Sequence, residues 1–350
     1  MGETQHMEHY AGLDISLRLT AVCVIDERGR VVSESKVASE PAAIADFLQP
    51  YAGTLALAGL EAGLLAPYLY SGLVERGLPA VCIETRHMKA FAKASPVKTD
   101  RKDARLIAQA MKAGLYRAVH VKTDQSQRLR FLLTARELLL RQVRQLEGTV
   151  RGSFKAFGLR MGNIAKRQFA DRARELAQGQ GLLAEVVGPL LAARKAMLEQ
   201  LARLDRMVLL ATRRDPICRR LMTAPGVGTV VALAFRTTID LPQRFRQSAT
   251  VAPHLGLTPR KFQSGETDRS GRISKYGDAM MRHLLYESAT LVLGRLKRPA
   301  QLKEWGLQIA ERRGIKRARV AVARKLAVIL HRMWLDGADF RWHNVPVQAA

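Results

Sequence analysis

Two aspartates lie three residues apart in the segment VKTDRKDARLIAQAMKAG, residues 97–114. The segment has the pattern of a basic helix, and side chains three apart share one helix face, so Asp100 and Asp103 would stand side by side. Like charges that close repel one another unless a cation lies between them. The pair is therefore a candidate for half of a metal site. The alternative is that Asp100 caps the helix while Asp103 pairs with a neighbouring basic residue.

Two further carboxylates fall in segments with the pattern of strands. Asp14 interrupts the apolar residues of the first expected strand, and Glu61 ends the apolar run GTLALAGLE. Burying an unpaired carboxylate is costly, so both residues need a partner or a metal ion. If their strands are neighbours, the two side chains converge, and Asp100 and Asp103 approach from the helix. Four carboxylates favour magnesium, and two such ions about 3.5–4 Å apart serve in-line phosphoryl transfer.

The elements that must position these residues form a mixed α/β region. YAGLDISL, TAVCVIDERG and RVVSESKV have the pattern of three strands joined by tight turns, and EPAAIADFLQPY is typical of a short helix. Strand GTLALAGLE, helix LLAPYLYSGLVERG, strand LPAVCIET and the helix of residues 97–114 follow. The order β-β-β-α-β-α-β-α predicts a mixed sheet with helices packed on it.

Long paired helices are expected next. Residues 127–151 and 182–210 each contain apolar residues that step by three and four, which is the seam of a paired helix. These residues are Leu139, Val143, Leu146, Val150, Met197, Leu201, Leu204 and Val208. An antiparallel hairpin within the chain and a coiled coil between two chains both satisfy this pattern.

The last third of the chain is predicted to be mostly helical. A helix that stops at Pro225, turns through PGVG and restarts at Thr229 resembles a helix-hairpin-helix, whose turn can bind a DNA phosphate; a plain helix connection has the same pattern. Residues 252–277 are rich in Gly, Ser, Thr, Arg and Lys, which predicts a loop. Helices are expected from about Asp278, and seven Lys/Arg fall within residues 312–325.

The charge of the chain is strongly positive and uneven. Its 350 residues carry a net charge of +26; residues 1–93 hold 8 Lys/Arg against 11 Asp/Glu, whereas residues 94–350 hold 49 against 20. This excess favours a nucleic acid, because each neutralised phosphate releases counterions. An anionic membrane surface is the alternative. No 18-residue apolar run predicts a membrane span, and the N-terminus lacks the pattern of a signal peptide.

Cysteine and histidine usage favours a cytoplasmic protein without zinc. The three cysteines are far apart and form no CxxC pair. Cys23 and Cys82 lie in apolar segments, so we expect buried, reduced thiols. The eight histidines show no spacing typical of zinc ligands.

The motifs GLDIS, LAGLEA and KTDRKDARLIA, with LGLTPRKFQSGETDRSGRISKYGDAMMRHLLY far downstream, give the chain a resemblance to a known family. It resembles the DEDD transposases of insertion sequences, which include Piv-type invertases and bridge-RNA-guided recombinases. The resemblance covers roughly residues 10–340. It implies a ribonuclease-H-like, RuvC-type α/β domain at residues 8–118, a helical or coiled-coil linker at 119–214, and a mostly helical transposase domain at 215–345.

The resemblance also implies roles for particular residues. Asp14, Glu61, Asp100 and Asp103 would bind magnesium, as two ions. Ser264 would be the nucleophile that joins covalently to the cleaved DNA phosphate, although by itself a serine beside Gly265 is typical of an ordinary turn. We expect nucleic acid to be bound by basic residues that flank the motifs, namely Lys98, Arg105, Arg260, Lys261, Arg269, Arg272, Lys275 and Arg282.

Together these observations predict a DNA recombinase that excises and inserts its own mobile element by magnesium-dependent cleavage and strand exchange. The family implies a structured guide RNA as a partner besides DNA, and a site shared between domains favours a dimer or larger homo-oligomer; no membrane partner is expected. A RuvC-like junction or structure-specific nuclease is the alternative. A nucleic-acid-binding scaffold without activity is the third hypothesis. Only strand exchange requires Ser264.

Overall fold

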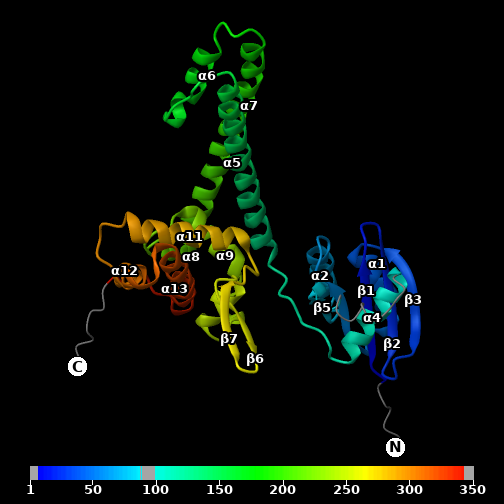
Figure 1. Ribbon diagram of the computed structural model, residues 1–350. Helices are drawn as coiled ribbons and strands as arrows, with labels where there is room; N and C mark the ends of the chain where they lie inside the picture. Colours follow the sequence, from blue (N-terminus) through cyan, green and yellow to red (C-terminus); the bar gives the residue numbers. More distant parts are fainter. Residues whose placement is uncertain (1–6, 87, 89–98, 343–350) are drawn as a thin grey trace, which may run out of the picture. The chain divides into compact units, whose positions relative to one another are not determined.

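The computed structural model describes residues 7–86, 88 and 99–342. The chain divides into two compact units, Met1–Lys122 (unit 1) and Thr123–Ala350 (unit 2). Unit 1 is a mixed α/β sheet region, and unit 2 is mostly helical with one β-hairpin among its described residues (Figure 1). The predicted combination of an α/β region followed by a mostly helical region is confirmed. The division into domains at residues 8–118, 119–214 and 215–345 stays a prediction.

In the described part of unit 1, one sheet has the strand order β3-β2-β1-β4-β5. β1 (His9–Ile15), β2 (Leu19–Asp26) and β3 (Val31–Ala38) form an antiparallel meander. β4 (Leu55–Glu61) and β5 (Ala80–Ile83) extend the sheet in parallel with β1. The predicted mixed sheet is therefore confirmed.

Helices cover both faces of this sheet. α1 (Pro41–Leu48) and α2 (Ala66–Glu75) pack on one face through an apolar core that contains Leu13, Val22, Val24, Ile44, Leu48, Leu60, Leu69 and Leu73. α4 (Asp100–Lys112) packs on the other face, where Ala104 and Ala108 meet side chains of β2. Successive side chains of a strand point to opposite faces of the sheet, so the strand residues of this second core alternate along the chain with those of the first core.

α4 lies unusually close to the strands, because two glycines leave it room. A Cβ on Gly12 of β1 would lie 2.0 Å from the carbonyl oxygen of Ala104 and 2.4 Å from the amide nitrogen of Ala108. A Cβ on Gly59 of β4 would lie 2.5 Å from Sδ of Met111. The backbone of α4 therefore rests on β1 itself, and this contact fixes which helix residues lie over which strand residues.

In unit 2, α5 (Asp124–Ala156) and α7 (Leu182–Arg214) lie side by side along their length (Figure 1). Ion pairs join Arg136 to Asp205 and Arg194 to Glu147, so the two helices run antiparallel within the chain. Where the C-terminal part of α5 lies beside the N-terminal part of α7, α6 (Phe169–Ala177) packs on both and contributes to a small apolar core. A coiled coil between two chains stays a prediction.

At the opposite end, the N-terminal part of α5 and the C-terminal part of α7 pack against a group of helices, and together they form the largest apolar core of unit 2. The helices that contribute to it include α8 (Pro216–Leu221), α9 (Thr229–Ile239), α10 (Val251–His254), α11 (Ala279–Gly294), α12 (Gln301–Arg313) and α13 (Ile315–Asp336). In the described residues, no helix is both long and apolar enough to cross a membrane.

The loop expected at residues 252–277 is wrong for much of its length. The chain forms a β-hairpin there, with β6 (Pro259–Ser264) paired antiparallel to β7 (Thr267–Ile273). A two-residue turn joins the strands, and Gly265 takes a positive φ of 51°. The side chains of both strands are exposed except at Ile273, so no alternation of apolar and polar residues marks them as strands.

Candidate active site

Asp14 and Glu61 lie near and at the carboxyl ends of two neighbouring parallel strands. Gly12 pairs with Gly59 and Leu13 with Leu60, so Asp14 and Glu61 follow in register. Because strand side chains alternate, each carboxylate shares the sheet face of the glycine two residues before it. That is the face on which α4 packs. The two strands are therefore neighbours, as the predicted convergence of these side chains requires, and the convergence itself stays a prediction.

The first turn of α4 carries the other two carboxylates. Thr99 is the N-cap, and its hydroxyl accepts a 3.3 Å hydrogen bond from the amide of Lys102. Asp100 and Asp103 both fall in the turn that follows, where the helix dipole favours negative charge. The capping role that the sequence left open for Asp100 therefore belongs to Thr99.

A lysine on the third strand reaches this turn. Lys36 of β3 pairs in register with Ala21 of β2, which pairs with Asp14 of β1. Its Nζ lies 2.6 Å from Oδ2 of Asp100, and both side chains are more than half exposed. Lys36 therefore stands in the same cross-strand row as Asp14, on the same face, and binds the first turn of α4.

A second set of charges fastens α4 to the same edge strand. The guanidinium of Arg105 donates two hydrogen bonds of 2.8 Å to the carboxylate of Glu34, which also pairs with Arg101. The hydrogen bond from Arg105 and the nearby charge of Arg101 lower the pKa of Glu34, against the opposing effect of its partial burial. Arg105, which we expected to bind nucleic acid, is thus already part of a bidentate ion pair.

Asp14 and Glu61 share a face and an end of the sheet, and Asp100 and Asp103 lie in the first turn of the helix that packs on that face, but the four carboxylates do not form a closed cage. Within residues 7–86, 88 and 99–342, no three Asp, Glu, His or Cys side chains gather as closely as the ligands of one metal ion. In type, the residues fit magnesium, because all four offer the hard oxygen atoms that it prefers. The site thus has a suitable donor set, and Lys36 contacts one member of it.

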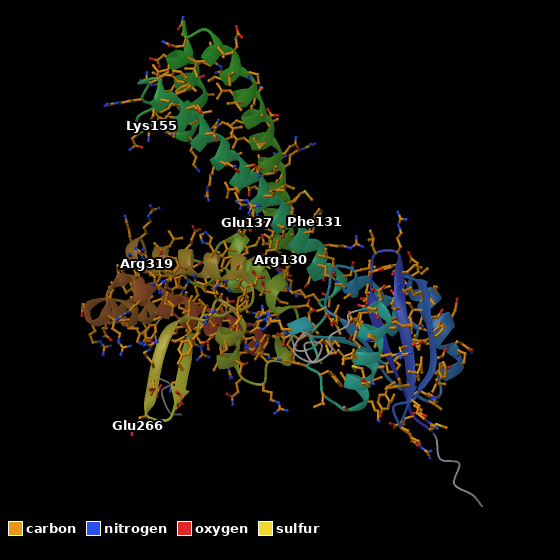
Figure 2. The ribbon with its side chains drawn as sticks, turned by 45° about the vertical axis from the view of Figure 1, so that its right-hand side comes forward. Arg130, Phe131, Glu137, Lys155, Glu266 and Arg319 are labelled. Carbon is orange, nitrogen blue, oxygen red and sulfur yellow. The ribbon has the colours of Figure 1, made fainter. Side chains whose placement is uncertain are left out.

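Ser264 is the last residue of β6 and is exposed. It pairs with Thr267 across the turn, and Figure 2 shows Glu266 at the outer tip of the hairpin. The basic residues of the hairpin are exposed too: Arg260, Lys261, Arg269 and Arg272. Lys261 pairs with Asp268 at 3.0 Å. The hairpin is therefore a projecting, positively charged element with the serine beside its tip.

The base of this hairpin is held tightly to the helical core of unit 2. A Cβ on Gly256 would lie 2.1 Å from the carbonyl oxygen of Tyr276, and a Cβ on Gly277 would lie 2.1 Å from that of His254. Arg282 donates hydrogen bonds to the carbonyls of Leu255 and Tyr276 at 3.1 and 2.8 Å. Arg282 thus braces the backbone at this point.

Among the other residues expected to bind nucleic acid, Lys275 is exposed and has a positive φ of 58°. Lys98 lies outside the described residues. The sequence reasoning missed Glu34 and Lys36. Their spacing in the expected strand RVVSESKV places them on one face, but nothing in the sequence says that this face meets a helix 64–71 residues later.

Comparison with known proteins gives matches along most of the chain. A family model described as Transposase IS116/IS110/IS902 family matches residues 218–305, and a DEDD transposase model for IS110 matches residues 11–157. The chain is 30% identical over 325 residues to the transposase for insertion sequence element IS1111A of Coxiella burnetii, covering 91% of this chain and 87% of the relative. It is also 30% identical over 331 residues to a probable family 20 transposase of Pseudomonas aeruginosa, covering 91% and 94%.

Proposed function

The chain belongs to the IS116/IS110/IS902 family of insertion-sequence transposases, which makes it a DNA-cleaving enzyme, and we propose that it exchanges DNA strands with Asp14, Glu61, Asp100 and Asp103 as magnesium ligands and Ser264 as nucleophile. The observation that supports this proposal is that Asp14 and Glu61 follow in register on neighbouring strands, while Asp100 and Asp103 lie in the first turn of α4, the helix that packs on the same face of the unit 1 sheet.

Unit 1 would supply the metal-dependent half of the reaction, as a ribonuclease-H-like domain. Its strand order and the helices on both faces support that fold. Divalent ions held by the four carboxylates, two ions in our proposal, would neutralise charge on the transferred phosphoryl group and lower the pKa of an attacking hydroxyl. The protein's own part is to hold the oxygen donors on a rigid sheet, with α4 seated on Gly12.

Unit 2 would supply the nucleophile. In the proposed step, Oγ of Ser264 loses its proton and attacks a DNA phosphorus, while the P–O bond to a deoxyribose oxygen breaks and that oxygen takes up a proton and leaves as a hydroxyl. In the second step, a hydroxyl of the new partner DNA attacks the same phosphorus, and the bond to serine breaks and releases the serine hydroxyl. One P–O bond forms and one breaks in each step, so the ester bond is conserved. The exposure of Ser264 on a projecting hairpin supports access to DNA.

The basic residues of the hairpin would hold the nucleic-acid backbone. Arg260, Lys261, Arg269 and Arg272 are exposed around the serine, and Lys275 follows them. Such cations contribute to affinity independently of base sequence. Lys98, Arg105 and Arg282 complete the proposed set, although Arg105 and Arg282 also hold structure together. A structured guide RNA and assembly into a homo-oligomer belong to the same proposal, and the excess of positive charge fits RNA as well as DNA.

An adduct assay separates strand exchange from hydrolysis. The full chain, purified from cells that also carry the element's flanking non-coding DNA, is incubated with labelled element-end DNA and magnesium. The expected product is a protein–DNA adduct that survives SDS, disappears with EDTA or Asp103→Asn, and is absent in Ser264→Ala. Ser270→Ala, on the neighbouring strand of the hairpin, is the matched control and should keep the adduct.

Two results would contradict the proposal in different ways. Normal cutting without an adduct in both the wild type and Ser264→Ala would indicate the alternative, a RuvC-like nuclease. An adduct that persists in Ser264→Ala would assign the nucleophile to another residue. Sequencing of RNA that co-purifies with the chain tests the guide, and the absence of any enriched RNA would count against it.

A further inference from the structure

We infer that Lys36 is a built-in counter-ion of the carboxylate site, which binds Asp100 in the metal-free enzyme and gives it up when a divalent ion binds. This inference rests on the proposed function, because it takes the four carboxylates as the metal site. It adds a residue that the DEDD motif does not contain. It also predicts that metal binding changes which group Lys36 faces.

The position of Lys36 is fixed by the strand register. Lys36, Ala21 and Asp14 are paired in turn across β3, β2 and β1, so their side chains project from the same face of the sheet. Nζ of Lys36 then reaches Oδ2 of Asp100 at 2.6 Å. The ammonium group is thus a positive charge already in contact with a proposed ligand oxygen.

Electrostatics makes Lys36 a competitor of the metal ion. In the metal-free enzyme, one ammonium partly offsets the repulsion among several carboxylates on one face. A divalent ion at the same oxygens offsets more of that repulsion, and it is repelled by an ammonium a few ångströms away. The two cations therefore exclude one another at Asp100, and Lys36 weakens metal binding as long as it stays there.

The surroundings allow Lys36 to leave without releasing α4. Glu34, two residues away on the same face of β3, separately holds Arg101 and Arg105 of the helix. A pocket of about 280 Å³ lies beside the pair, and its lining includes Lys36, Ala21 and Ala104 together with the charged side chains of Glu34 and Arg101. The small side chains of the two alanines leave the lysine room to turn.

Direct measurement of Mn²⁺ binding to the full chain, by calorimetry or by the electron-paramagnetic-resonance signal of free Mn²⁺, tests this inference. In Lys36→Met we expect Mn²⁺ to bind about three- to tenfold more tightly than in the wild type, a modest factor because the pair is half exposed. Lys36→Arg keeps the charge and should bind Mn²⁺ as the wild type does. Lys112→Met, about 18 Å further along the same helix, is the matched loss of charge and should change little.

A second measurement uses thermal unfolding with and without MnCl₂. Lys36→Met should melt at a lower temperature than the wild type without metal, because the carboxylates lose their counter-ion. It should gain more from MnCl₂, since tighter binding to the folded state raises the melting temperature further.

The outcomes of these measurements separate the role of Lys36 from the existence of the metal site. If the wild type binds Mn²⁺ in a manner that Asp103→Asn abolishes, but Lys36→Met binds it no more tightly, the role of Lys36 is wrong and the metal site stands. If the wild type does not bind Mn²⁺, or if Asp103→Asn leaves binding unchanged, the metal site is wrong and the inference about Lys36 falls with it.

Discussion

Arg130 of α5 and Asp278, the N-cap of α11, form an ion pair of 2.8 Å between residues 148 positions apart in the sequence. Their side chains are only 22% and 14% exposed. Asp278 also accepts hydrogen bonds from the amide of Met281 at 2.9 Å and the hydroxyl of Thr238 at 3.1 Å. Burial raises the pKa of Asp278, but these bonds and the Arg130 charge outweigh it and lower the pKa. One carboxylate therefore connects α5, α9 and α11.

Arg130→Met should destabilise unit 2 by about 3 kcal/mol, because it leaves the largely buried carboxylate of Asp278 without a compensating positive charge. Urea unfolding followed by a probe in unit 2 measures this change. The control is Arg128→Met, two residues away on the same helix, whose partner Asp124 is exposed; its loss should cost less than about 1 kcal/mol. Equal costs for the two variants would show that burial of the Arg130 pair contributes nothing.

The three cysteines should be inert in the folded chain. All three thiols are buried, and burial raises the pKa of each. The pKa of Cys23 rises to about 11 and that of Cys218 to about 12. Since the thiolate is the reactive form, Ellman's reagent at pH 8 should label less than one thiol per native chain and all three in guanidinium chloride. Rapid labelling of the native chain would contradict the burial of these residues.

The parts of unit 1 that the sequence predicted are those with a strong local pattern. Each strand that carries a proposed ligand is a short apolar run with a clear end, and α4 begins after a capping threonine. The face of the sheet on which Asp14 and Glu61 lie then follows, because successive side chains of a strand point to opposite faces. Local pattern and long-range packing agree here, which is why the elements could be placed from sequence.

The parts that could not be predicted depend on contacts between distant residues. Lys36 reaches Asp100 across 64 residues, and Glu34 reaches Arg105 across 71, although each looks like a solvated residue of an edge strand. The β6–β7 hairpin has no apolar face, so its strands are stabilised by pairing and by the tight fit of Gly256 and Gly277 at its base. Neither effect leaves a periodic signal in the sequence.

His331 should make unit 2 less stable in weak acid. Its ring is buried; Nε2 donates to the carbonyl of Pro242 at 3.0 Å, and Nδ1 accepts from the hydroxyl of Ser248 at 2.9 Å. Burial lowers its pKa, so the unfolded chain, with a pKa of about 6.5, takes up the proton first. The stabilisation is complete above about pH 6.5 and is lost as the pH falls through the lowered pKa of the folded state.

The measurement for His331 is the urea midpoint of unit 2 at pH 7.5 and pH 5.5. We expect the wild type to lose stability at the lower pH and His331→Gln to lose less. His283→Gln is the matched control, since His283 is an exposed histidine on α11 and its side chain is 63% accessible. The same pH dependence in His331→Gln as in the wild type would assign the acid sensitivity to another group.

Replacing each of three glycines of unit 1 by alanine should weaken the packing of α4 on the sheet to a different extent. In Gly12→Ala the new Cβ would meet backbone atoms of Ala104 and Ala108 at 2.0 and 2.4 Å, and neither can move unless the whole helix shifts. We expect a loss of about 3 kcal/mol in the stability of unit 1. In Gly59→Ala the nearest atoms belong to the flexible side chain of Met111, so the loss should be smaller.

Gly53→Ala completes the series, because nothing lies within 4 Å of the point that its new methyl group would occupy, and the change should cost less than about 1 kcal/mol. Hydrogen exchange of the α4 and β1 amides gives the readout: protection should fall most in Gly12→Ala, less in Gly59→Ala and not in Gly53→Ala. Since α4 carries Asp100 and Asp103, DNA cleavage should follow the same order. Full protection in Gly12→Ala would mean that the helix does not rest on β1.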